Sequence, residues 1–225
     1  MPFEDLVADP RIWRGRGRVA TAALPTGFAV LDRHLPGGGW PRRAITEILL
    51  DRYGIGELSL LMPALARLSE HASRAKRWIV WIAPPYVPYA PALLFSGIDL
   101  SRVLLVEPRR EKKDVLWAVE QALRSGSSIA VLAWLEKASN IVLRRFQLAA
   151  EEHDCWAVLF RSGRALRESS PAALRVRLSG AFEKARLEIV KCRGKRPCSV
   201  TLELSAPSHM QALPSRHSSP RALPI

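Results

Sequence analysis

The chain has 225 residues, of which 48% are hydrophobic, and its formal net charge is +13. This length and apolar content predict one sizeable hydrophobic core, and the excess of Lys and Arg favours a polyanion or an acidic protein as partner. The three cysteines have no C-x-x-C spacing, which argues against a zinc site, and no apolar run approaches the roughly 20 residues of a membrane span. Because the N-terminus is acidic rather than signal-like, we expect a cytoplasmic protein.

Residues 1–23 are predicted to form an N-terminal basic arm. After a short acidic segment the arm reads RIWRGRGR, so that Trp13 lies among Arg11, Arg14, Arg16 and Arg18. Arginines around one indole would suit phosphate contacts and stacking on a base. The other interpretation is a solvated arm whose Trp packs on the domain, and the residues leave both open.

A single domain is predicted over residues 24–204, and it begins with a helix, a glycine turn and a strand. The short helix starts near Thr26, the turn lies at residues 37–39, and the apolar strand covers 44–50. A second helix follows, because Leu58, Leu61, Met62, Leu65 and Leu68 recur at helical spacing.

The loop between this strand and the second helix has the layout of a phosphate-binding loop but lacks its chemistry. Gly54 and Gly56 suit a tight turn whose backbone N–H groups face an anion. A P-loop continues with a Lys for the outer phosphates and a Ser or Thr for Mg²⁺. Here Glu57 and Leu58 follow instead. We therefore predict a degenerate P-loop that binds no nucleotide cofactor.

The rest of the domain alternates strands and helices, which predicts a doubly wound, mostly parallel α/β sheet. Further on, alternating segments at 185–192 and 199–204 flank GKRP and predict an antiparallel hairpin at the sheet edge. The tail, 205–225, has four prolines, five serines and no acid, so we expect flexible, disordered termini. The remaining predicted strands are 78–83, 103–106, 129–135 and 156–160, and the remaining long helices are 114–124 and 140–153.

No catalytic constellation is visible, and we expect a protein that is not an enzyme and needs no metal or cofactor. The His residues are scattered, and His153, Asp154 and Cys155 are adjacent in sequence, which does not make a triad. An ATPase would also need a carboxylate at the end of a buried strand to hold Mg²⁺. The strand 129–135 offers Ala133 and Trp134 there.

Two sets of exposed side chains are candidates for binding. Tyr86 and Tyr89 lie in a loop stiffened by four prolines, where aromatic residues lose little entropy on binding a partner. They could equally cap the sheet edge. Residues 161–196 hold eleven Lys or Arg against three acidic residues, so they could contact phosphates, pair with an acidic partner, or simply be solvated.

The order of segments resembles a known family. TGFAVLDRHLPGGGWPRRAITEI resembles the beginning of a RecA core, and ALRSGSSIAVLAWL resembles the SulA superfamily of bacterial SOS proteins. Residues 24–204 together are most similar to the ImuA family, RecA-like accessory proteins of mutagenic translesion synthesis. The chain departs from RecA at Glu57, Leu58 and Ala133, so ATP-driven filament chemistry does not carry over.

The resemblance implies a non-catalytic, damage-inducible protein that supports error-prone translesion DNA synthesis. Its implied partners are an ImuB-like Y-family homologue, an error-prone replicative-type polymerase and RecA. It also implies DNA contact after the strand 156–160, at 162–180 and the neighbouring turn, by non-specific binding of single-stranded DNA. The nucleic-acid-binding candidates are Arg164, Arg167, Arg175, Arg177, Lys191, Arg193, Lys195 and Arg196.

Two alternatives use the same resemblance. A SulA-like SOS cell division inhibitor would act on FtsZ and have no DNA role, but members of that group are shorter and lack a long region after the last core strand. A nucleotide-dependent DNA ATPase is disfavoured by Glu57. The long basic region at the C-terminal end of the domain therefore favours the ImuA family.

Overall fold

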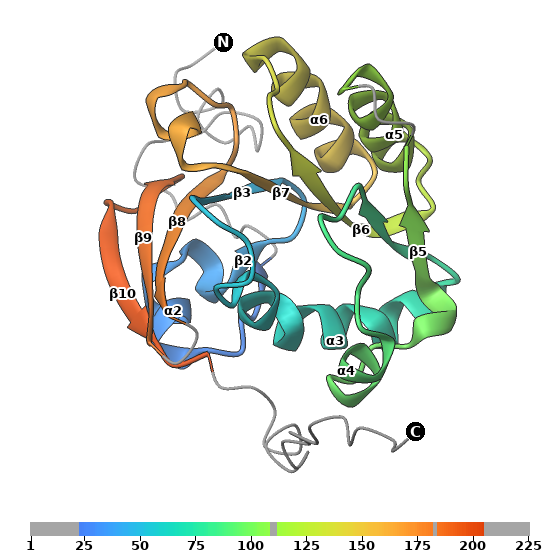
Figure 1. The fold of residues 1–225 in the computed structure, drawn as a ribbon, viewed down its shortest axis with the longest axis horizontal. Coiled ribbons are helices and arrows are strands. Elements are labelled where there is room, and N and C mark those ends of the chain that lie inside the picture. The colour runs from blue at the N-terminus through green and yellow to red at the C-terminus, as the bar shows by residue number, and fades with distance from the viewer. Residues whose placement is uncertain (1–22, 109–111, 182–183, 205–225) are drawn as a thin grey trace, which may run out of the picture.

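A computed structural model describes residues 23–108, 112–181 and 184–204, and its centre is an eight-stranded sheet (Figure 1). The strand order is β10-β9-β8-β3-β7-β6-β4-β5. The strands from β8 across to β5 pair in parallel, whereas β9 is antiparallel to both β8 and β10. The strands are β3 (Ile45–Leu50), β4 (Trp78–Ile82), β5 (Val103–Val106), β6 (Ser128–Leu135), β7 (Trp156–Ser162), β8 (Leu174–Ala181), β9 (Lys184–Cys192) and β10 (Cys198–Leu202).

Helices cover both faces of the sheet. Figure 1 shows α5 (Lys112–Arg124) and α6 (Asn140–Glu152) above it, and α2 (Ala29–His34), α3 (Glu57–Ala75) and α4 (Ala90–Phe95) below it. Two separate clusters of buried apolar residues correspond to these layers, one with Leu65 of α3 and the other with Phe146 of α6. Strands covered on both faces are near-continuous apolar runs. Every residue of β3 and β6 is buried, and most of them are apolar.

The segment before β3 closes one end of the core. Here β1 (Ala23–Leu24) pairs with β2 (Trp40–Pro41), and a 3₁₀ turn, η1 (Pro36–Gly38), joins α2 to β2. Thr26 prepares the start of α2, because its hydroxyl accepts a hydrogen bond from the Phe28 backbone N–H at 3.0 Å. Trp40 is fully buried and stacks on Trp156 of β7 with ring centroids 5.8 Å apart.

The buried face of the long helix α3 agrees for the most part with the face predicted from its leucines. Leu61, Leu65 and Leu68 are buried, whereas Leu58 and Met62 are only partly buried at the margin of the core. Pro63 lies inside the helix rather than in its first turn. It packs against Gly27, where an added Cβ would lie 2.4 Å from the Pro63 Cβ, so the helix passes closely over the segment that precedes α2.

The structure confirms the mixed α/β architecture, the mostly parallel sheet and the antiparallel hairpin. The segment 162–180, for which the resemblance implied DNA contact, contributes a strand to the sheet. It forms a 3₁₀ turn, η3 (Gly163–Arg167), and then β8, which pairs with β3 in the sheet. A further 3₁₀ turn, η2 (Leu100–Arg102), precedes β5.

The predicted basic arm up to residue 22 and the predicted disordered tail from residue 205 lie outside the described residues. Within the described ranges, no helix combines the length and the apolar character needed to cross a membrane. The sheet and its two helical layers therefore carry the features that position the candidate sites.

Candidate functional site

The glycine loop connects the end of β3 to the start of α3, and its anion is supplied by the chain itself. The Glu57 carboxylate accepts from the Gly54 backbone N–H at 2.9 Å (Oε1) and 3.0 Å (Oε2). It also accepts from the Ile55 backbone N–H at 3.0 Å. Glu57 is 5% exposed, so this carboxylate occupies the position that the loop N–H groups surround.

The backbone conformation of the loop requires its two glycines. Gly54 and Gly56 have φ of 79° and 102°, a region that other residues rarely adopt. A Cβ built at Gly54 would meet no heavy atom within 4 Å. The consecutive N–H groups of such a turn form a concavity for anions at the positive end of the helix. The shape predicted from the sequence is therefore present, and it holds a carboxylate.

Apolar and aromatic side chains fill the positions where a nucleotide enzyme would hold its metal ion. Ala133 of β6 is fully buried. Trp134 is stacked on Phe160 with ring centroids 4.5 Å apart, and it contacts Trp81 at 5.7 Å. Within the described residues, no group of three His, Cys, Asp or Glu side chains is placed to hold a metal ion.

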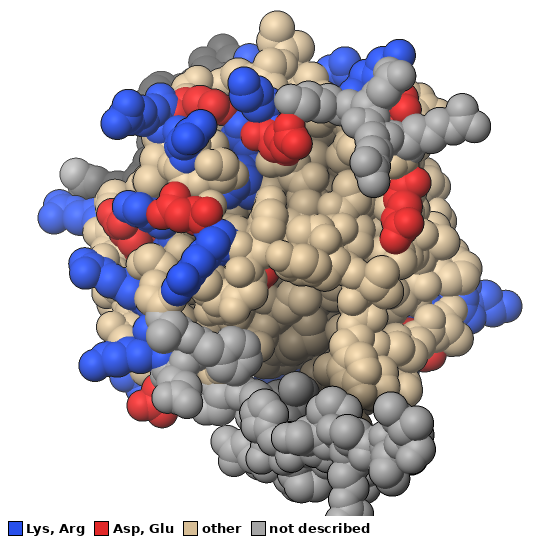
Figure 2. All heavy atoms as spheres, in the orientation of Figure 1, with Lys and Arg blue, Asp and Glu red and all other residues tan. Residues whose placement is uncertain are grey.

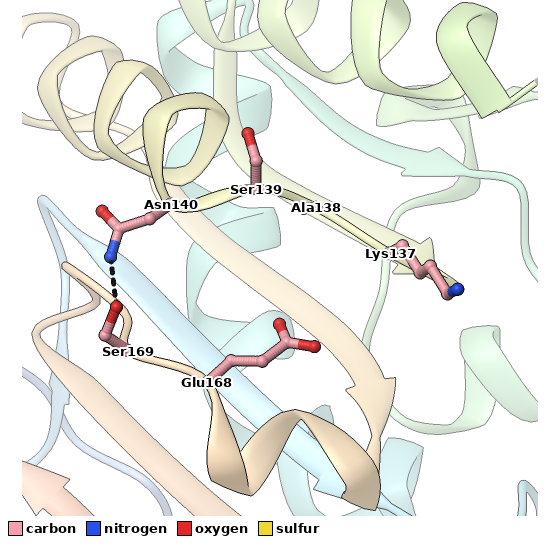
Figure 3. A pocket seen from close by; sticks show the side chains of 6 residues that line it. All are labelled: Lys137, Ala138, Ser139, Asn140, Glu168 and Ser169. Atoms are coloured by element: carbon pink, nitrogen blue, oxygen red, sulfur yellow. Dashed lines mark hydrogen bonds between the residues drawn. The ribbon is translucent and has the colours of Figure 1, made fainter.

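Two hollows open at the carboxyl ends of the parallel strands, where the glycine loop also lies. One, of about 430 Å³, lies between the end of β6 and the segment after η3 (Figure 3). Asn140 donates to the Ser169 hydroxyl across it at 2.7 Å, and Glu168 extends beside them. The other, of about 470 Å³, lies between the ends of β4 and β6 and is lined mainly by apolar residues, with Tyr53 reaching in from the glycine loop.

A buried charge cluster crosses the centre of the sheet, and the sequence analysis missed it. Glu47 of β3 is fully buried and accepts from Arg161 Nη1 at 2.7 Å and from Arg175 Nε at 2.6 Å. Arg161 also contacts the Glu168 carboxylate at 2.7 Å. The available signal was a single acidic residue inside the apolar run AITEILL, since a buried charge requires a partner.

The structure corrects the predicted nucleic-acid-binding set in two ways. First, Arg175 is 5% exposed and bound to Glu47, so it belongs to the core and is unsuited to contact a phosphate. Second, the remaining residues do not form one patch. Arg164 and Arg167 lie in η3, which follows the carboxyl end of β7, whereas Arg193 follows β9 at the other end of the strands.

At the carboxyl end of β7, Arg164 and Arg167 are exposed, and Arg177 is half-buried and pairs with Asp51 at 3.1 Å. The other end of the strands carries the turn between β9 and β10. There Lys195 donates to the Arg33 carbonyl at 2.5 Å, and Arg196 is exposed. Figure 2 shows Lys and Arg gathered on the side of the molecule that carries β9 and β10, with a mostly uncharged centre.

Two other basic residues, Lys191 at the end of β9 and Arg193 in the turn, make contacts within the protein. Arg193 pairs with Glu151 at 3.4 Å. Lys191 donates to the Ser170 carbonyl at 2.6 Å. Burial, followed by the nearby positive charges of Arg193 and Arg175, lowers the pKa of Lys191. A polyanion at this end of the strands would therefore meet Lys195 and Arg196 more readily than Lys191.

The proline-rich loop after β4 presents its aromatic residues to solvent. Tyr86 is 74% exposed and Tyr89 is 66% exposed, so neither side chain is buried against the sheet. Val87 beside them and Leu94 of α4 are also more than half exposed. These apolar side chains form a candidate contact surface next to the edge strand β5.

Comparisons with known proteins now add to this geometry. Residues 44–156, half of the chain, match the family model described as cell division inhibitor SulA. The chain belongs to the SulA family. The matched region covers β3 to the start of β7 and therefore includes the glycine loop, but it excludes β8 to β10.

The individual proteins that are similar to this chain divide into those that match most of it and those that match about half of it. Protein ImuA from Caulobacter vibrioides is 27% identical over 217 residues, which covers 85% of this chain and 87% of that protein. Cell division inhibitor SulA from Edwardsiella piscicida is 34% identical over 94 residues, 42% of this chain and 54% of that protein. The crystal structure of SulA from Pseudomonas aeruginosa, 30% identical, covers 52% of this chain and 98% of its own, with a TM-score of 0.42.

The similarity to ImuA confirms the resemblance seen in the residues. It extends well beyond the matched family region, into the parts of the chain that the SulA relatives leave unmatched.

Proposed function

We propose that this SulA-family chain is a non-catalytic accessory protein of SOS-induced DNA damage tolerance that supports error-prone translesion DNA synthesis. The observation that carries the proposal is the similarity to Protein ImuA over 85% of this chain and 87% of that protein. In this proposal its partners are an ImuB-like Y-family homologue, an error-prone replicative-type polymerase and RecA. Its role is recruitment or regulation.

The domain itself is proposed to be RecA-like, with nucleotide dependence lost. The order of helix, glycine turn, strand and glycine loop supports the first part. The second part is supported by the carboxylate of Glu57 in the loop and by the apolar residues Ala133 and Trp134 beside it. Partner contact would then need no bound ATP and no hydrolysis.

Separate surfaces are proposed for protein and for DNA. Tyr86 and Tyr89 present rigid aromatic area to a protein partner. Single-stranded DNA would bind non-specifically at the turn between β9 and β10, where Lys195 and Arg196 are exposed. The two surfaces lie at different ends of the sheet order, so both contacts can form at once.

A SulA-like division inhibitor acting on FtsZ is the second candidate, because the matched family model carries that description. Two assays distinguish the candidates. The ImuA-like function predicts that the protein co-purifies with an ImuB-like partner and leaves FtsZ polymerisation unchanged in light scattering. Inhibition of FtsZ assembly at sub-stoichiometric protein, without capture of an ImuB-like partner, would overturn the proposal in favour of the division inhibitor.

The protein-contact surface is tested by replacing Tyr86 and Tyr89 together with Ala. We expect the partner complex to weaken at least tenfold, while the melting temperature changes by no more than a few degrees because both side chains are exposed. Ile141 and Leu148, exposed apolar residues of α6, give a matched control pair. Equal weakening by both pairs would show that the tyrosines have no special role.

The DNA surface is tested by two triple Ala variants that remove the same amount of charge from opposite ends of the strands. The first changes Arg193, Lys195 and Arg196 at the β9–β10 turn, and the second changes Arg164, Arg167 and Arg177. Oligonucleotide affinity should fall steeply with salt, because each phosphate contact releases counterions. The variant at the β9–β10 turn should flatten the slope of log K against log salt by roughly one to three. If the other variant alone flattens it, the contact lies beside β7.

A further inference from the structure

The glycine loop contains everything that an anion site requires, including the anion. The backbone N–H groups of Gly54 and Ile55 point at one carboxylate, with three contacts of 2.9–3.0 Å. The loop lies at the N-terminus of α3, a helix of 19 residues whose dipole favours negative charge there. The Glu57 carboxylate belongs to the first residue of that helix and is almost completely buried.

A carboxylate can replace a phosphate group here because both are negative and both offer oxygen acceptors to backbone N–H groups. A tethered group also has an advantage over a free one. It loses no translational entropy on entering the loop, because it is already part of the chain. Its effective concentration at the loop is therefore far above that of a cellular anion. The loop is therefore filled in every molecule.

We propose that Glu57 is the permanent internal ligand of the glycine loop and holds the loop and the first turn of α3 in an anion-bound conformation. The domain is then fixed in one state and does not respond to nucleotide or phosphate. A free phosphate would have to expel the carboxylate and leave two negative groups close together. This inference concerns the loop alone and does not depend on the proposed cellular role.

The neighbours of Glu57 connect the glycine loop to the first turn of α3. Tyr53 precedes Gly54, and the pKa of its hydroxyl is raised by burial first and then by the negative charges of Glu136 and Glu57. Leu60 closes the first helical turn by donating its N–H to the Gly56 carbonyl at 3.0 Å. The carboxylate is thus joined to both the loop and the helix, and its removal should loosen both.

Chemical rescue tests the proposal on the full-length protein. Glu57→Ala removes the carboxylate and leaves space for a small anion. We expect its melting temperature to fall by about 4–8 °C, because two charge-assisted hydrogen bonds are lost. Acetate or inorganic phosphate, at constant ionic strength against chloride, should restore part of the loss in a saturable way, as for any ligand of the folded state.

Three comparisons make the result decisive. Wild type should show no more than the general salt effect, and Glu57→Gln, which leaves no room, should not be rescued. Glu70→Ala, an exposed glutamate of the same helix, should neither lose stability nor respond. Equal stabilisation of wild type and Glu57→Ala by these anions would overturn the proposal, as would a Glu57→Ala variant as stable as Glu70→Ala.

Hydrogen exchange provides a second measurement if Glu57→Ala does not fold. In Glu57→Gln, the amides of Gly54 and Ile55 lose a charged acceptor, so exchange in residues 51–58 should accelerate at least tenfold while the sheet is unchanged. Unchanged exchange in this segment would show that the carboxylate does not hold the loop.

Discussion

The buried cluster around Glu47 yields the largest expected effect of a single substitution. Glu47→Gln keeps the shape of the side chain and removes its charge. Arg161 Nη1 and Arg175 Nε, now 2.7 and 2.6 Å from the carboxylate, would then be two buried cations with one neutral acceptor. Arg161 keeps Glu168, but Glu168 is 52% exposed and is a weaker partner.

The magnitude follows from the burial of all three groups. The exposed fractions of the side chains are 0% for Glu47, 1% for Arg161 and 6% for Arg175. Removing one partner of such a buried pair costs about 3–5 kcal/mol, a large part of a typical domain stability of about 5–15 kcal/mol. The melting temperature should therefore fall by roughly 10 °C or more.

An exposed ion pair on β8, the strand that also carries Arg175, provides the control. Arg177 pairs with Asp51 at 3.1 Å, with 38% and 65% of the side chains exposed. Arg177→Ala should cost no more than about 1 kcal/mol, because solvent screens the pair. Urea unfolding followed by tryptophan fluorescence measures both variants, and the midpoint gives the difference when the slope is unchanged.

The reasoning is refuted if Glu47→Gln and Arg177→Ala unfold within 1 kcal/mol of each other. A further variant tests the cause. Replacing Glu47, Arg161 and Arg175 together with Met removes all three charges of the buried cluster, so it should recover part of the loss. A triple variant less stable than Glu47→Gln would show that hydrogen bonds to the surrounding carbonyls, rather than unpaired charge, dominate.

The filled loop, the buried Cys155 thiol and two glycines give further expected outcomes. A fluorescent ATP analogue with Mg²⁺ should not bind in the low-micromolar range, and measurable turnover would contradict the filled loop. Burial raises the pKa of Cys155 to about 12, so this thiol should not react with Ellman's reagent at pH 8 until urea unfolds the protein. The same shift adds stability that is present below pH 9 and lost as the pH rises towards 12, and alkaline melting curves measure it. Gly39→Ala should cost about 2–3 kcal/mol, because its Cβ would lie 2.2 Å from the Leu24 carbonyl oxygen, whereas Gly38→Ala, with open space but φ of 79°, should cost about 1 kcal/mol in urea unfolding.

Local pattern was enough to predict most of the secondary structure. The apolar runs at 78–83 and 129–135 became β4 and β6, and the spacing of Leu61, Leu65 and Leu68 placed the buried face of α3. The glycine loop was also visible, because Gly54 and Gly56 determine the backbone conformation at their own positions. These features depend on neighbours within a few residues, and such information is contained in any short stretch of sequence.

Tertiary structure decided where the charges belong. Glu47 meets Arg161 and Arg175 across 114 and 128 residues of sequence, so no local pattern could pair them. The basic residues after β7 and around the β9–β10 turn are close in sequence, yet the path of β8 and β9 places them at opposite ends of the strands. The sequence established the charge of Glu57, but its role required the fold. Only the helical first turn of α3 brings that carboxylate back onto the N–H groups of the loop.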